Sequence, residues 1–472
     1  MELAQLDMSE HDTKDFIDRE AELELLEEAW RKGGFALVVV YGRRRVGKTR
    51  LLLEFAKGKR LLYYAAIEAP LEELREDFAR AAKAQLGVPA SGDPIDLLEW
   101  LASTGQRVLV VLDEFQYMVE ADPSLPSRLQ RSIDATLSGS GVFLAVCGSA
   151  VSFFERELLA YRSPLFGRSS LSLKLAPLGF PQVRRYLGGY PIEEAVLAYG
   201  VFGGTPAYLK MLDPSRSVLE NLRSLLKPGS RFYEEAPNLL RQELREPRTY
   251  IGILAALASG ERRPSQLASA AGVDARALPK YLAVLEELDI VARVARVGGR
   301  GSKLDFRDNY FRFWFAFAYR LRHLIEAGFA EEAVEHVEEG LPRYMGPVYE
   351  SLVRELLPHL YRAGLVPVRP VEVGSWWSGK AEIDVVAREP GRATAFIEVK
   401  WRTVGGEEAL EMLEELEAKA SGSGLLSPEN YYVLVVKRAE GRLRLPERRR
   451  LLQLSDVEAA LSGASGRGSG PA

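Results

Sequence analysis

The feature that most constrains this 472-residue chain is an apolar segment, residues 35–41, that runs directly into a glycine-bounded loop. The loop, residues 42–49, has the pattern G-x-x-x-x-G-K-T and opens into Leu-Leu-Leu-Glu-Phe, which predicts a helix start. A buried strand, a tight loop and a helix in this order cradle the phosphates of a nucleoside triphosphate. Lys48 is then expected to reach the β- and γ-phosphates, and Thr49 to offer its hydroxyl to Mg²⁺.

The residues expected to bind ATP are contiguous in this motif. The arginines inside the loop are compatible with it, because backbone N–H groups make the cradle and the side chains can point outward. A chance turn rich in glycine and lysine is the alternative, and the strand before and the helix after the loop argue against it. The predicted set is Gly42, Arg43, Arg44, Arg45, Val46, Gly47, Lys48, Thr49 and Arg50.

A second apolar run, residues 108–112, is followed by two adjacent carboxylates. Asp113 is the expected Mg²⁺ partner, and Glu114 is placed to polarise an attacking water, the general-base role that hydrolysis needs. Adjacent acids of this kind are typical of ATPases with an extra strand between the phosphate-loop strand and the Mg²⁺ strand. A strand that merely ends in acidic residues is the alternative, and the role of Gln116 stays open.

Composition and length bound the remaining possibilities. A chain of this length is expected to hold two to four domains, and 47% hydrophobic with 27% charged residues is ordinary for a globular protein. The apolar runs fall short of the roughly 18 residues of a membrane span, and the first residues do not resemble a signal peptide, so a cytoplasmic protein without a membrane partner is expected. Few amide residues beside many charged ones hint at a thermophile. Cys147, the single cysteine, is expected to be a buried strand residue.

Alternating strand and helix signals predict a parallel sheet with helices on both faces. Residues 16–26 read as an amphipathic helix, residues 180–230 as a helical lid, and the Gly/Ser-rich end of the chain as a disordered tail. The aromatic run 310–319 is either core or a base-stacking surface. The four histidines are scattered, so no zinc site is expected.

Residues 264–288 read as helix, glycine-containing turn, helix, and a basic segment, residues 290–312, follows them. Together they predict a winged helix-turn-helix. Two interpretations stay open: contact with double-stranded DNA by the second helix and the wing, or a packing module between domains. The net charge of −4 gives no general attraction to nucleic acid, and the second helix carries both cations and acids.

The last third contains a second candidate site on two predicted strands joined by a Pro-Gly turn. Asp384 lies on the first strand, and Glu398 and Lys400 lie two residues apart on the second, so the latter pair points to the same face. Two carboxylates for Mg²⁺ and a lysine that activates water form the D-x(n)-E-x-K constellation of restriction-endonuclease-like nucleases. Ile383 stands where a proline usually precedes the first Asp, and whether this site cuts DNA stays open.

The motifs together resemble the archaeal branch of AAA+ ATPases related to signal-transduction ATPases, followed by a winged helix and a nuclease-like domain. The resemblance rests on residues 16–20, 42–49, 112–116, 147–149, 163–168, 203–206 and 308–315. It implies that Ser149 reads the γ-phosphate and that Arg168 stabilises transition-state charge, within the chain or across a subunit boundary. Thr205 and Pro206 look like the lid motif over the adenine and sugar, and Glu350 looks like the acidic metal ligand on the first nuclease-fold helix.

The expected fold class is α/β, with five parts in chain order. They are a P-loop AAA+ core (1–178), a helical lid (179–235), a winged helix-turn-helix (236–320), a restriction-endonuclease-like domain (321–460) and a tail (461–472). The expected function is Mg²⁺-dependent ATP hydrolysis that controls DNA binding or cleavage. The alternative is a nucleotide switch whose inactive C-terminal domain binds a partner, and a homo-oligomer is compatible with both.

Overall fold

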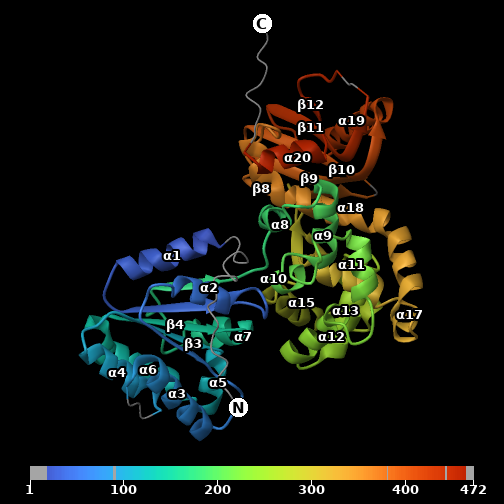
Figure 1. Cartoon of the computed structure of the whole chain (residues 1–472). Coiled ribbons are helices and arrows are strands. Elements are labelled where there is room, and N and C mark those ends of the chain that lie inside the picture. Colours follow the sequence, from blue (N-terminus) through green and yellow to red (C-terminus); the bar gives the residue numbers. More distant parts are fainter. Residues whose placement is uncertain (1–18, 89–91, 380, 442–443, 464–472) are drawn as a thin grey trace. The chain divides into compact units, whose positions relative to one another are not determined.

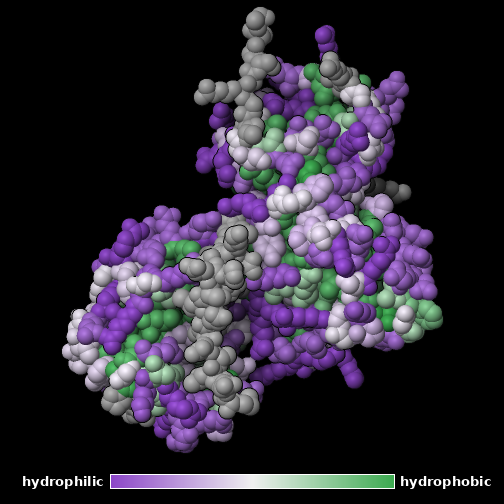
Figure 2. All heavy atoms as spheres, in the orientation of Figure 1, coloured by the Kyte–Doolittle hydropathy of each residue, from purple (hydrophilic) through white to green (hydrophobic). Residues whose placement is uncertain are grey.

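The computed structural model describes residues 19–88, 92–379, 381–441 and 444–463 of the chain. The chain forms two compact units, Met1–Pro177 and Leu178–Ala472. The first residues of the expected N-terminal helix, His11 and most of the expected tail lie outside the described residues. Within them, no helix combines the length and the apolarity that crossing a bilayer requires. The face of the molecule seen in Figure 2 is mainly hydrophilic in both units.

The first unit contains a five-stranded parallel sheet of order β2-β3-β4-β1-β5, as predicted (Figure 1). Strand β4 lies between the phosphate-loop strand β1 and the strand β3 that carries the acid pair, which confirms the expected extra strand. These strands read as continuous apolar runs because helices cover both faces of the sheet. Their bounds are Ala36–Tyr41 (β1), Leu61–Ala65 (β2), Val108–Asp113 (β3), Val142–Gly148 (β4) and Leu171–Lys174 (β5).

Two hydrophobic cores lie on opposite faces of this sheet, and alternate residues of β1 supply them. Leu37 and Val39 belong to one core, Val38 and Val40 to the other, as the two-residue period of a strand requires. Cys147 is buried in the second core, as expected. The helices of this unit are α1 (Glu20–Arg31), α2 (Lys48–Phe55), α3 (Leu71–Leu86), α4 (Pro94–Ser103), α5 (Phe115–Ala121), α6 (Leu125–Ala135), η2 (Leu137–Gly139), α7 (Val151–Phe153) and η3 (Phe154–Leu158).

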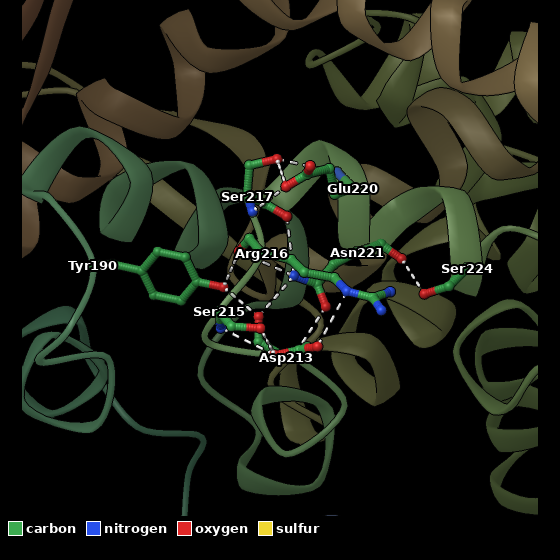
Figure 3. A network of polar contacts seen from close by, with 8 residues as sticks. All are labelled: Tyr190, Asp213, Ser215, Arg216, Ser217, Glu220, Asn221 and Ser224. Carbon is green, nitrogen blue, oxygen red and sulfur yellow. Dashed lines mark hydrogen bonds and ion pairs between the residues drawn. The ribbon is translucent and has the colours of Figure 1, made fainter.

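The second unit begins with the helical stretch that the sequence predicts. Its helices are α8 (Phe180–Tyr186), α9 (Ile192–Phe202), α10 (Pro206–Leu209), α11 (Val218–Leu225) and α12 (Arg231–Glu243). A polar network fixes the turn before α11 (Figure 3): the Tyr190 hydroxyl donates to two backbone carbonyls, and Ser217 and Glu220 form a capping box. The buried Asn221 amide nitrogen lies within hydrogen-bonding distance of the same two carbonyl oxygens and of the Ser217 carbonyl oxygen. This turn is therefore held by structural hydrogen bonds.

Three helices and an antiparallel two-stranded hairpin follow. They are α13 (Pro247–Ala258), α14 (Pro264–Ala271), α15 (Leu278–Glu287), β6 (Val291–Ala295) and β7 (Ser302–Phe306). The aromatic run is core, because Tyr310, Phe311, Phe313 and Phe315 are fully buried. It forms α16 (Asn309–Phe313) and η4 (Trp314–Ala318), and α17 (Arg322–Glu326) comes next.

The C-terminal part is a mixed sheet of order β12-β11-β10-β9-β8 with the long helix α18 (Ala330–Arg362) before it. The Pro-Gly turn joins β9 and β10 as an antiparallel hairpin, as predicted, whereas β10, β11 and β12 run parallel. The elements are β8 (Glu372–Ser378), β9 (Ala381–Glu389), β10 (Ala393–Gly405), α19 (Gly406–Ser421), β11 (Glu429–Glu440), β12 (Arg449–Leu452) and α20 (Leu454–Leu461).

Candidate functional site

The phosphate loop requires glycine at its two ends. Gly42 has φ +151°, and a Cβ there would lie 2.3 Å from the carbonyl oxygen of Leu175. Gly47, with φ +98°, precedes the first residue of α2. Arg45, between them, also has a left-handed backbone, with φ 70°. Left-handed residues in a tight turn direct successive backbone N–H groups to one side, which makes a concave anion-binding surface.

Lys48 lies across this loop. Its ammonium donates to the carbonyl oxygens of Gly42 (2.8 Å) and Arg43 (3.0 Å), and the residue is only 6% exposed. These two contacts position the ammonium over the loop. The loop therefore places a cationic side chain beside its backbone donors, an arrangement that suits a polyphosphate.

The predicted metal ligands of this site are in contact with each other. The Thr49 hydroxyl donates to Asp113 Oδ2 at 2.6 Å, which joins the start of α2 to the end of β3. Tyr63, on β2, donates to the same oxygen at 3.0 Å. Burial, reinforced by the charge of Asp113, raises the pKa of the Tyr63 hydroxyl far above its usual range, so it stays a neutral donor. Hydroxyl and carboxylate oxygens fit a hard divalent cation such as Mg²⁺.

Glu114 is held apart from Asp113 by its backbone. Its φ of 50° is left-handed, and its Oε2 accepts hydrogen bonds from the Ser149 hydroxyl (2.8 Å) and the Ser149 backbone N–H (3.2 Å). Gln116, whose role the sequence leaves open, donates to the same carboxylate oxygen through Nε2. Because β4 lies next to β3, Ser149 at the end of β4 comes within reach of Glu114. The structure thus brings Glu114, Ser149 and Gln116 together.

Arg168, which is predicted to stabilise transition-state charge, forms an ion pair with a residue of α6. It makes a two-pronged ion pair with Asp134, with Nε and Nη2 at 3.0 and 2.8 Å from the two carboxylate oxygens. Thr205 and Pro206 begin α10 in the second unit, and Thr205 is completely buried. The proposed roles of these residues toward ATP stay predictions.

Arg19 is a residue that sequence reasoning missed as part of this site. Its guanidinium donates to the carbonyl oxygens of Val46 in the phosphate loop (3.2 Å) and of Ala176 (2.6 Å). It also pairs with Glu22 at 2.8 Å. Arg19 thereby fixes the back of the loop to the segment after β5. In the sequence, the only sign of this role is that Arg19 lies within residues 16–20, one of the segments that carry the family resemblance.

The C-terminal candidate residues converge as the sequence predicts. Lys400 Nζ lies 2.7 Å from Glu398 Oε1 and 3.5 Å from Asp384 Oδ2. The ladder between β9 and β10 runs as far as Val385 and Ile397, and beyond it Asp384 Oδ2 accepts a hydrogen bond from the Val399 N–H at 2.9 Å. The strands therefore part at this point, and the two carboxylates share one ammonium.

A second lysine, Lys419 on α19, lies 3.3 Å from Glu398 Oε2. The sequence shows it only as the end of an acidic helix, and the packing of that helix on the sheet brings it to the site. In the described ranges, no three His, Cys, Asp or Glu side chains form a preformed metal cluster. Asp384 and Glu398 nevertheless fit a divalent cation, since their oxygens are hard ligands and already surround a positive charge.

Glu350, on α18, lines the same cleft as Asp384 and Glu398. Burial, and next the negative charge of Asp384, raises the pKa of Glu350 to about 7. Burial and the charge of Glu398 raise the pKa of Asp384 as well. Burial alone would lower the pKa of Lys400, but the nearby Asp384 and Glu398 shift it upward overall. Carboxylates that hold their protons more tightly than usual are typical of functional sites, although structural ion pairs also produce them.

Most cations of the basic segment are paired within the second unit. The hairpin packs on the edge strand β8, where the Val297 N–H donates to the Ser375 carbonyl at 3.0 Å. Four ion pairs of 2.6 to 3.0 Å neutralise side chains of the basic segment, residues 290–312: Arg293–Glu286, Lys303–Glu382, Arg307–Asp289 and Arg312–Asp305. This is what a packing module between domains would show.

The strand order, the phosphate loop and the acid pair define a P-loop ATPase core with a strand inserted between its two signature strands. Comparison with known families agrees: residues 16–212 match an ATPase domain predominantly from Archaea. Residues 314–413 match a family of archaeal and bacterial proteins of unknown function. The chain therefore carries an archaeal-type ATPase domain joined to a C-terminal domain of that second family.

Individual relatives are also archaeal. An uncharacterized protein of Methanocaldococcus jannaschii is 28% identical over 90% of this chain and 97% of its own length. An uncharacterized ATP-binding protein of the same organism is 46% identical over 10% of this chain and 78% of its own length. Among solved structures, a Walker-type ATPase of Pyrococcus abyssi superposes with TM-score 0.49 at 20% identity, covering 64% of this chain and 97% of that one. The ORC2 protein of Aeropyrum pernix, in ADPNP–ADP complexes, gives 0.42 at 15% identity, with 69% and 96% covered.

Proposed function

We propose that this protein hydrolyses ATP with Mg²⁺ and uses its nucleotide state to control a DNA-directed activity of the second unit, ending in phosphodiester cleavage. The ATPase half rests on the family match and on the contact between Thr49 and Asp113 beside Lys48. The cleavage half rests on one observation: Asp384, Glu398 and Lys400 meet at the point where β9 and β10 part.

In the ATP site each side chain has a separate task. Backbone N–H groups of residues 42–47 and the ammonium of Lys48 bind the phosphates. Glu114 accepts a proton from the attacking water, and Ser149 holds the Glu114 carboxylate in position. Thr49 and Asp113 would hold Mg²⁺, which when bound supplies charge neutralisation to the β- and γ-phosphates. Arg168 is proposed to reach the transition state after release from Asp134.

In the second site Asp384, Glu398 and Glu350 would hold a divalent cation, which when bound polarises the scissile phosphate. Lys400 orients the attacking water and stabilises the negative charge that develops on the phosphoryl oxygens. This role requires Lys400 to leave at least one carboxylate, and Lys419 remains to bind Glu398.

The second candidate function is a nucleotide switch whose C-terminal domain binds a partner without cutting. The observation that favours it is the pairing of the basic hairpin within the unit, which leaves few cations for a DNA groove. In that case the carboxylate–lysine cluster is a structural ion-pair network.

Nicking of supercoiled plasmid with Mg²⁺ or Mn²⁺, with and without ATP, separates the two functions. The native chain is compared with Lys400→Ala and Lys48→Ala. Cutting that disappears in Lys400→Ala establishes the nuclease, and a change in Lys48→Ala shows that ATP controls it. If protein that hydrolyses ATP never cuts, the switch is the better account.

A further inference from the structure

The cleft above Asp384 and Glu398 has a second wall, and the helix-turn-helix segment supplies it. The cleft measures about 540 Å³. Glu350, Glu382, Asp384, Glu398 and Lys419 line it from the C-terminal domain, and Gly260, Arg262, Arg263, Gln266 and Lys303 line it from the turn before α14, from α14 itself and from β7. Both walls belong to the second unit.

The cations of the second wall differ in how closely they are paired with acids. Lys303 is paired with Glu382 at 2.7 Å, and Arg262 reaches Asp305 only at 3.9 Å. Arg263 and Gln266 are exposed, and among the described residues their side chains make no hydrogen bond or ion pair. A cation without an internal partner, facing carboxylates across a cleft, is placed to receive an anion that lies between the walls.

We infer that Arg263, with Arg262 and Gln266, binds the phosphate backbone of a single DNA strand and lays it over Asp384, Glu398 and Lys400. The inference rests on the proposed nuclease function for the purpose of that strand, but the binding itself does not require cleavage. It makes the turn before α14 the DNA-facing element of this segment, in place of α15 and the turn before it, which carry the exposed cations Lys280 and Arg276.

The size of the cleft favours a single strand over a duplex. A cleft of 540 Å³ is in the range of small-ligand sites, which admits a nucleotide or two between its walls. A duplex, whose major groove alone is about 12 Å wide, needs more room than one or two nucleotides. Contacts with backbone phosphates position a strand without reading its sequence, so binding is expected to tolerate any base order.

The test measures binding of the full-length protein to a labelled single-stranded oligonucleotide by fluorescence anisotropy, with the matching hairpin duplex as the second probe. Arg263→Glu is compared with Arg276→Glu, which makes the same charge change at another exposed residue of the segment. Arg263→Glu is expected to weaken single-strand binding at least tenfold, and Arg276→Glu by less than twofold. In Arg263→Ala the slope of log K against log salt should fall by about 0.7, the value for one phosphate contact to a single strand.

Unchanged ATP hydrolysis and thermal unfolding in all three variants exclude a folding defect. The inference is overturned if the single strand does not bind, if Arg276→Glu weakens binding more than Arg263→Glu, or if the duplex binds better and ignores Arg263. Binding that depends on Arg263 without cutting in any metal supports the inference and contradicts the nuclease. DNA cutting that is unaffected by substitution of Arg263 contradicts the inference and supports the nuclease.

Discussion

The two candidate sites use similar residue types and hold them in opposite ways. In the first unit the acids are bound by neutral groups: Asp113 by the hydroxyls of Thr49 and Tyr63, and Glu114 by Ser149. In the second unit the acids are bound by cations, Lys400 and Lys419. Neutral donors position a carboxylate and leave its charge available, whereas lysines compensate the charge. The first site is arranged for ligands from solution, and the second must exchange internal ion pairs to accept them.

The largest expected effect is a loss of ATP hydrolysis when Glu114, which neutral donors hold in place, is substituted. Glu114→Gln should keep ATP binding and lower the rate of ATP hydrolysis about 10²-fold or more, because the attacking water loses its general base. Nucleotide binding and phosphate release, measured on the same preparation, check this. Glu398→Gln is the matched change in the second site and should leave ATP hydrolysis unaltered. A similar loss in both variants would mean that the two sites do not act separately.

The second prediction concerns stability against pH in the second site. The pKa of Glu350 is about 7 in the folded protein and near 4.3 in an unfolded chain, so the folded state holds this proton more tightly. The contribution of this proton to the free energy of unfolding is therefore complete below about pH 4 and is lost as the pH rises through 7. Glu350→Gln should remove this dependence and become more stable than the native chain by about 1 to 3 kcal/mol at pH 8. Denaturant unfolding at pH 5 and pH 8 measures the stability of Glu350→Gln and of the native chain. A stability difference between them that is equal at both pH values would contradict the prediction.

A smaller effect is expected at Ser149, which acts through Glu114. Ser149→Ala removes the 2.8 Å hydroxyl contact but keeps the backbone donor, a loss of about 1 to 1.5 kcal/mol. ATP hydrolysis should therefore slow roughly tenfold, with ATP affinity nearly unchanged. Ser149→Thr, which keeps a hydroxyl, should recover most of the rate. A large loss of ATP affinity instead would assign Ser149 to the phosphates.

The smallest effect is expected from Lys419, which would compete with a metal ion for the carboxylate of Glu398. Lys419→Met should change the free energy of unfolding by less than about 1 kcal/mol, because the ion pair with Glu398 is partly exposed. It should nevertheless raise Mn²⁺ affinity by up to about fivefold, since Glu398 loses a competing cation. Lys437→Met, which removes a comparable pair with Glu193, is the control and should leave Mn²⁺ affinity unaltered. A weaker Mn²⁺ affinity in Lys419→Met would contradict the competition.

The sequence predicts the parts of these sites that lie in local motifs. A phosphate loop carries its strand, glycines and helix within one segment, and the Pro-Gly turn fixes the hairpin that brings Asp384 beside Glu398. Lys419 and Arg263 could not be predicted, because only the packing of α19 and the turn before α14 brings them to the cleft. The internal ion pairs of the basic hairpin were equally hidden, since Lys303 meets an acid 79 positions further on, Glu382.

A titration with Mn²⁺ in the absence of nucleotide shows whether the carboxylates of the second unit form a metal site. Electron paramagnetic resonance reports the free Mn²⁺ at each step for the native chain, Asp384→Asn and Thr49→Ala. We expect bound Mn²⁺ in the native chain that is lost in Asp384→Asn and retained in Thr49→Ala. Mn²⁺ binding that is the same in the native chain and Asp384→Asn would contradict it and leave the cluster as a structural ion-pair network.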